Sequence, residues 1–86
     1  MENELFTSLR SKLEDKPDSL IFARLAELLY ESGNTDAAFA LLEKGIAQNP
    51  NYITGYVVFG NLLLASQQYD KAKNIYRRAI EIDPFN

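Results

Sequence analysis

An 86-residue chain with a net charge of −3 and a pI near 4.8 has room for one small domain. That charge gives it no general attraction for nucleic acid or anionic membranes. A hydrophobic fraction of 47% is typical of a globular protein, and the absence of cysteine excludes disulfides and thiolate zinc sites.

No part of the chain has the pattern of a targeting or membrane segment. The opening stretch is acidic and lacks the continuous apolar core of a signal peptide. No stretch approaches the ~20 apolar residues that cross a bilayer. We therefore expect a cytoplasmic protein without a membrane partner.

Helical periodicity predicts five amphipathic helices separated by short turns. The first covers residues 2–14. The second covers residues 19–32, with Asp18 or Ser19 as its N-cap and Gly33 as its stop signal.

The remaining three helices follow the same spacing. The third covers residues 36–48, with Thr35 as its N-cap. The fourth covers residues 52–66, although the β-branched and aromatic run at 56–59 makes a strand the competing prediction. The fifth runs from residue 69 or 70 to residue 82. Because the connections are short, successive helices should pack antiparallel.

Two segments of the chain match each other at a shift of 34 residues. The matched pairs are Phe22 with Tyr56, Leu25 with Phe59, Ala38 with Ala72, Leu42 with Tyr76, Ile46 with Ile80, and Pro50 with Pro84. A repeat of that length, made of two amphipathic segments, indicates a stacked helical array. The match also favours a helix over a strand for the fourth segment.

These residues resemble the tetratricopeptide repeat (TPR) pattern, W-x2-L-G-x2-Y, then A-x3-F, then P, over ~34 residues. The copies read Phe22-x2-Leu25-Ala26-x2-Leu29, Ala38-x3-Leu42, Pro50 and Tyr56-x2-Phe59-Gly60-x2-Leu63, Ala72-x3-Tyr76, Pro84. The resemblance implies an all-α solenoid of stacked antiparallel helix hairpins, with about five helices. It would be a single TPR-like domain over 1–86, with an N-terminal half-repeat helix at 1–16 and full repeats at 19–52 and 53–86.

The small residues of the pattern should lie where two helices approach most closely. Ala38 and Ala72 would take that place on one helix of each hairpin, and Ala26 and Gly60 on the other. Gly45 departs from this scheme, because it stands inside the third predicted helix. There we expect it to cost about 1 kcal/mol relative to alanine.

In the TPR family the first helix of each repeat lines a concave groove that accepts a peptide. The resemblance therefore implies a protein or peptide partner held between residues 19–32 and 52–66. The expected lining residues are Arg24, Glu27, Tyr30, Glu31, Thr54, Val57, Val58, Asn61 and Leu64. The alternative is ordinary surface, with some of these residues packed against neighbouring helices.

One TPR subclass clamps a C-terminal carboxylate with lysine and asparagine side chains. The matching positions here hold Ala23, Glu27 and Val58. Asn61 is the only matching amide, so we do not expect a carboxylate clamp. The groove should instead suit an apolar or aromatic segment that carries a positive charge near Glu27 and Glu31.

Catalysis and nucleic-acid binding are not expected. The chain has no histidine or cysteine, so the commonest general base and the strongest nucleophile are missing. No phosphate loop or metal-ligand cluster is present, and we expect no cofactor. The last helix carries Lys71, Lys73, Arg77 and Arg78, but interleaved acids predict a solvated face there.

A second hypothesis concerns the fifth helix, which has no further polar helix after it to cap the stack. The residues that a next helix would ordinarily cover are Ile75, Tyr76, Ala79 and Ile82. Either a homodimer joins through the fifth helices, or the chain is a fragment of a longer TPR scaffold. An assembly role is therefore the alternative to peptide binding.

Overall fold

A computed structural model describes residue 7 and residues 20–84 of the chain. The described residues form α2 (Phe22–Glu31), α3 (Thr35–Gln48), α4 (Ile53–Ala65) and α5 (Tyr69–Ile82), and no strand. The prediction of an all-α fold is confirmed, and the segment at 56–59 is helical. Apart from residue 7, the helix predicted over 2–14 lies outside the described residues.

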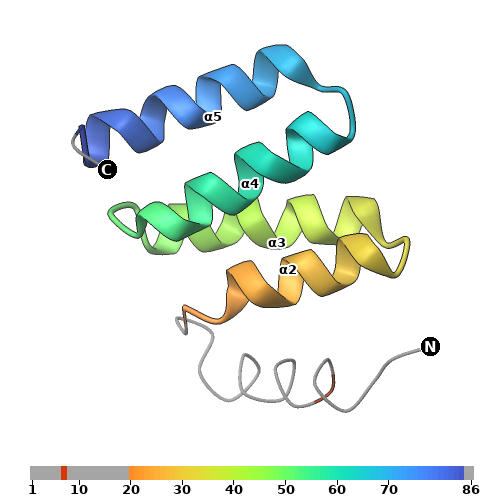
Figure 1. Ribbon diagram of the computed structural model, residues 1–86. Helices are drawn as coiled ribbons and strands as arrows, with labels where there is room; N and C mark the ends of the chain where they lie inside the picture. Colours follow the sequence, from red (N-terminus) through yellow and green to blue (C-terminus); the bar gives the residue numbers. More distant parts are fainter. Residues whose placement is uncertain (1–6, 8–19, 85–86) are drawn as a thin grey trace.

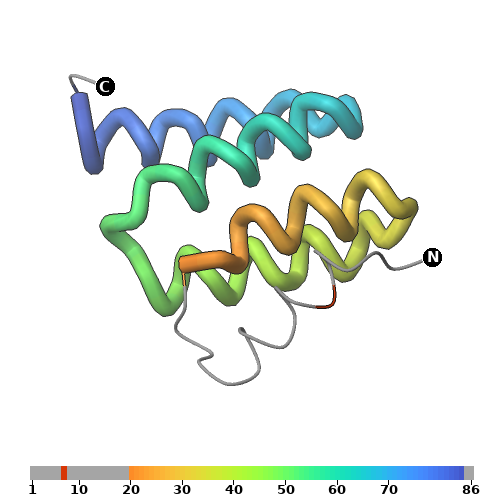
Figure 2. The backbone as a smooth tube through the Cα atoms, turned by 60° about the horizontal axis from the view of Figure 1, so that its bottom comes forward, coloured from red at the N-terminus to blue at the C-terminus, as the bar shows by residue number. Residues whose placement is uncertain are grey.

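The four helices form two antiparallel hairpins, α2–α3 and α4–α5 (Figure 1). α4 joins the hairpins, because it packs against both α2 and α3 as well as against α5. Among these four helices the backbone of α5 packs closely only against that of α4. A second view, in which the bottom of Figure 1 comes forward, shows α4 and α5 as one layer and α2 and α3 as the layer beside it (Figure 2).

Both hairpins turn through the same C-capping motif. Gly33 has a φ of 91°, its N–H donates to the Tyr30 carbonyl, and the N–H of Asn34 donates to the Leu29 carbonyl. This is the Schellman pattern, and it confirms Gly33 as a helix stop. The second hairpin repeats it with Gln67, whose φ is 65°. A non-glycine residue in this left-handed region carries strain that Gly33 avoids.

The predicted helix starts are shifted. α3 begins at Thr35 and not after it, because the Asn34 carbonyl already accepts the first helical hydrogen bond, from Ala38 N–H at 3.0 Å. Asn34 therefore holds the N-cap position, and the prediction of Thr35 as the cap is wrong. α2 begins at Phe22, later than the predicted residue 19, with Ile21 in the N-cap position. The caps proposed at residues 18 and 19 lie outside the described residues.

The core of the first hairpin is built around Phe22, which is 1% exposed. A Cβ at Gly45 would lie 2.2 Å from Cδ2 of Phe22, and one at Gly55 would lie 2.8 Å from its Cζ. The Tyr52 ring meets the same phenyl group edge-on at a centroid distance of 5.9 Å. Glycine at position 45 leaves the space that the ring fills, and this packing opposes the penalty expected from helix propensity alone.

Where its two helices approach each other, the second hairpin pairs side chains whose sizes differ from those at the matching positions of the first hairpin. A Cβ at Gly60 would lie 2.5 Å from Cε1 of Tyr76, so that ring rests directly on the backbone of α4. At the matching positions of the first hairpin, Ala26 and Leu42 are both fully buried. A larger ring in one repeat thus faces a smaller residue, and the total volume between the helices is maintained.

Candidate interaction surfaces

The predicted groove residues lie on two helices that pack against each other, α2 and α4. Their side chains differ in exposure. The exposed ones are Arg24, Glu31, Thr54, Asn61 and Leu64, and the half-buried ones are Glu27, Tyr30, Val57 and Val58. Four of the five exposed side chains are therefore polar, whereas Val57 and Leu64 line hollows between α4 and α5.

Several of these residues contact other parts of the same chain. Arg24 pairs with Glu27 at 3.7 Å between Nη1 and Oε1. The Tyr30 ring lies 6.2 Å from the ring of Phe39, and Val58 packs against the core. The Asn61 Oδ1 accepts a hydrogen bond from the Tyr76 hydroxyl. Part of the predicted groove thus holds the helices together.

A second surface, which we call the α4/α5 face, carries the large exposed apolar side chains of the second hairpin. Leu64 is 47% exposed, Tyr69 60% and Ile80 61%. Two hollows of about 410 and 230 Å³ adjoin each other here and share Tyr76 and Ile80 as lining residues. The face consists of Ile53, Val57, Leu64, Tyr69, Tyr76 and Ile80, with Lys73 and Arg77 beside the first hollow and Asp83 beside the second.

The same surface on the first hairpin is covered. Ile46, which matches Ile80 in the repeat, is only 5% exposed, and Leu42, which matches Tyr76, is fully buried. The cover is α4, since a Cβ at Gly55 would lie 3.1 Å from Cγ2 of Ile46. The α4/α5 face is therefore the repeat-equivalent of a surface on which the fold already seats a helix.

The residues predicted for self-association do not all lie on the surface that a next helix would cover. Ile75 and Ala79 are buried within the two hairpins, and Ile82 is half-buried against the core. Of the predicted set, Tyr76 and Ala79 line the hollows of the α4/α5 face, and Ala79 offers little surface there. Sequence reasoning missed Ile80, although its match with the buried Ile46 could have identified it.

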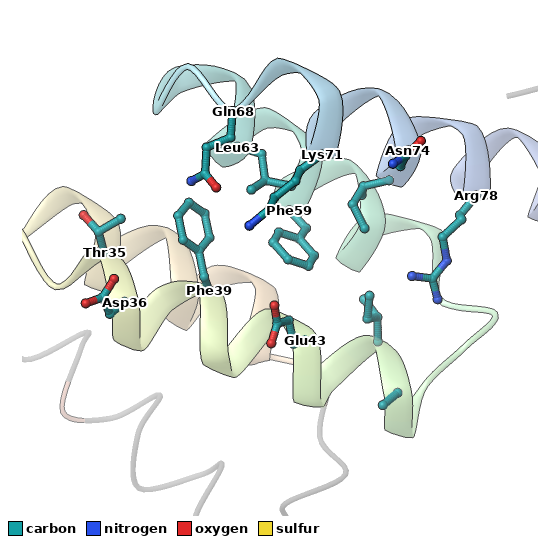
Figure 3. A pocket seen from close by; sticks show the side chains of 13 residues that line it. Thr35, Asp36, Phe39, Glu43, Phe59, Leu63, Gln68, Lys71, Asn74 and Arg78 are labelled. Atoms are coloured by element: carbon teal, nitrogen blue, oxygen red, sulfur yellow. The ribbon is translucent and has the colours of Figure 1, made fainter.

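A third feature is a groove between α3 and α5, with a volume of about 700 Å³. Its floor is apolar: the rings of Phe39 and Phe59 lie 5.9 Å apart at 34°. Asp36 and Glu43 stand on the α3 wall, and the side chains of Lys71 and Arg78 extend from α5 on the other side (Figure 3). The remaining lining residues are Thr35, Ile46, Ala47, Leu63, Gln68, Asn74 and Ile75.

The basic cluster of the last helix is divided between these two surfaces. Lys71 and Arg78 line the groove between α3 and α5, whereas Lys73 and Arg77 border the α4/α5 face. All four are exposed. The Arg78 guanidinium also lies over the ring of Tyr56, 5.2 Å from its centroid.

In residues 7 and 20–84, no group of three acidic side chains is placed to hold a metal ion. None of the helices described has the length and apolar character needed to cross a bilayer.

Residues 29–86 match the family model of the tetratricopeptide repeat. This match covers well over half of the chain, and the chain belongs to the TPR family. No curated protein matches the chain. The family is typically a non-catalytic fold that mediates protein–protein interaction.

Proposed function

We propose that this chain is a non-catalytic interaction module that binds an apolar helical segment of another polypeptide on its α4/α5 face. The observation that carries the proposal is the contrast between Ile46, 5% exposed under α4, and Ile80, 61% exposed at the matching position. A helix placed on Ile80 as α4 is placed on Ile46 would bury the same kind of surface a second time.

The chemistry of the face specifies the kind of helix. Full burial of a large apolar side chain such as Leu64 or Ile80 contributes about 1.5–3 kcal/mol. Lys73 and Arg77 border the same hollow, at positions that hold Phe39 and Glu43 in the first hairpin. A partner helix with acidic residues beside its apolar stripe would therefore complement the face. A two-fold pairing of two such faces would bring four cations and only two acids, the two copies of Asp83, into one interface, and this excess of like charge disfavours a homodimer.

The natural probe is α4 itself, supplied as a separate peptide. A peptide of residues 51–66 carrying Thr54→Glu, Asn61→Glu and Ala65→Glu keeps the buried side of the helix and adds acids on its exposed side. We expect it to bind the intact protein in a fluorescence titration. Ile80→Asp should weaken that binding by about tenfold or more, because it places a charge in the centre of the contact.

Asn74→Asp serves as the matched control, since it adds one negative charge to α5 on the side away from this face. Equal binding by the wild type and Ile80→Asp would contradict the proposal. Light scattering at several concentrations tests the alternative, a homodimer through this face. A dimer of twice 9.8 kDa that dissociates on Ile80→Asp would show that a second copy covers the face.

The concave peptide groove across α2 and α4 remains a second proposal. It is supported by the packing of the two helices side by side and by the exposure of Arg24, Glu31 and Thr54. Arg24→Glu tests it, because α2 does not contact α5. A partner that loses affinity on Arg24→Glu and keeps it on Ile80→Asp would be bound in the groove, and the opposite result would place it on the α4/α5 face.

A further inference from the structure

The groove between α3 and α5 has walls of opposite charge with the same spacing. Asp36 and Glu43 are seven residues apart on α3, and Lys71 and Arg78 are seven apart on α5. Seven residues correspond to two helical turns, or about 10.5 Å, so both members of each pair face the groove. One wall is therefore acidic and the other basic over the same length.

These charges do not neutralise each other across the groove. Among residues 20–84, no ion pair joins either acid of α3 to either cation of α5. The backbones of α3 and α5 do not approach each other closely, and α4 supplies Phe59 and Leu63 to the floor between them. All four charged side chains are exposed, so the groove presents them to whatever enters it.

The dimensions of the groove indicate what could enter. Its lining runs from Thr35 to Ala47 along α3, which is about 18 Å of helix. The groove has a volume of about 700 Å³ and is partly open to solvent. An apolar strip with charges repeated every two turns on each side matches the surface of another helix, in the way that flanking charges complement a coiled-coil seam.

We infer that this groove binds an amphipathic helical segment of a partner protein that carries basic residues on one flank of its apolar stripe and acidic residues on the other. The basic flank faces Asp36 and Glu43, and the acidic flank faces Lys71 and Arg78. The apolar stripe lies on the rings of Phe39 and Phe59. Turning such a helix end for end exchanges its flanks, so the two walls also fix the direction in which the partner runs.

This site is separate from the α4/α5 face. The two surfaces use different sides of α5: Lys71 and Arg78 belong to the groove, and Lys73 and Arg77 belong to the face. The inference therefore does not depend on the function proposed above, and substitutions on α5 can distinguish the two.

The experiment uses three synthetic helical peptides of about 18 residues with one common apolar stripe. The first carries lysine on one flank and glutamate on the other, the second lysine on both, and the third glutamate on both. Binding to the intact protein is measured by calorimetry. We expect the mixed peptide to bind about tenfold more tightly than either of the others, since each of those meets one wall of like charge.

A double substitution then reverses one wall. Lys71→Glu with Arg78→Glu makes both walls acidic, and the preference should move to the all-lysine peptide. Lys73→Glu with Arg77→Glu is the matched control, because it makes the same change in net charge on the same helix. The control should keep the preference for the mixed peptide. Circular dichroism checks that both proteins fold, and Lys71→Glu alone retains the contact of Arg78 with Tyr56.

Equal affinity for the three peptides would overturn the inference. The inference would also fail if the control substitutions changed the peptide preference as much as the groove substitutions did. A mixed peptide that loses its affinity on Ile80→Asp but not on Lys71→Glu would be bound on the α4/α5 face, and the groove would then have no such role.

Discussion

Replacing Gly45 by alanine separates helix propensity from packing in this protein. In an exposed helix interior the change would stabilise the fold by about 1 kcal/mol, because alanine restricts the unfolded chain and suits helical geometry. Here the new Cβ would lie 2.2 Å from Cδ2 of Phe22, well inside van der Waals contact. Forcing extra volume into a packed core typically costs about 1–3 kcal/mol.

The ring has little freedom to move aside. Phe22 is 1% exposed, and Gly55 and Tyr52 contact other edges of the ring. We therefore expect Gly45→Ala to destabilise the protein by about 2 kcal/mol, despite the gain in propensity. For a domain of this size that loss lowers the melting temperature by about 8–16 °C.

Urea and thermal denaturation followed by circular dichroism measure this change directly. Phe22→Leu provides the relief variant: in the Gly45→Ala background it should cost less than it does alone, which gives a favourable coupling in a double-mutant cycle. Ala79→Gly, at the matching position of the second hairpin, should simply lose about 1 kcal/mol. A Gly45→Ala protein as stable as the wild type would refute the packing argument.

Two further predictions concern the turn and the second hairpin. Gln67→Gly should stabilise the protein by about 1 kcal/mol in urea denaturation, because it relieves a side chain held at a φ of 65°. Gly33→Ala should do the reverse at the matching turn, although nothing lies within 4 Å of its new Cβ; equal stability in either variant would contradict the strain argument. Gly60→Ala should destabilise by about 1–3 kcal/mol through its contact with the Tyr76 ring. Adding Tyr76→Leu to Gly60→Ala should restore much of the lost stability. If the effects of the two substitutions were additive in the double mutant, the proposed contact between position 60 and the Tyr76 ring would be contradicted.

The architecture of the two hairpins follows from local features of the sequence. Helical spacing depends on residues three and four positions apart, and the turn at Gly33 depends on the conformational freedom of one residue, so both can be read locally. The match at a shift of 34 residues aligns the ambiguous segment at 56–59 with a segment of clear helical periodicity, and it correctly favoured a helix there.

The other features depend on contacts between residues that are distant in sequence, so only the folded structure reveals them. The value of glycine at position 45 depends on where the ring of Phe22 lies. Ile75 and Ile80 look alike on one amphipathic helix, yet the packing of α4 against α5 buries the first and leaves the second 61% exposed. The groove between α3 and α5 exists only because α4 holds two oppositely charged helices apart, and no single segment of the sequence contains that arrangement.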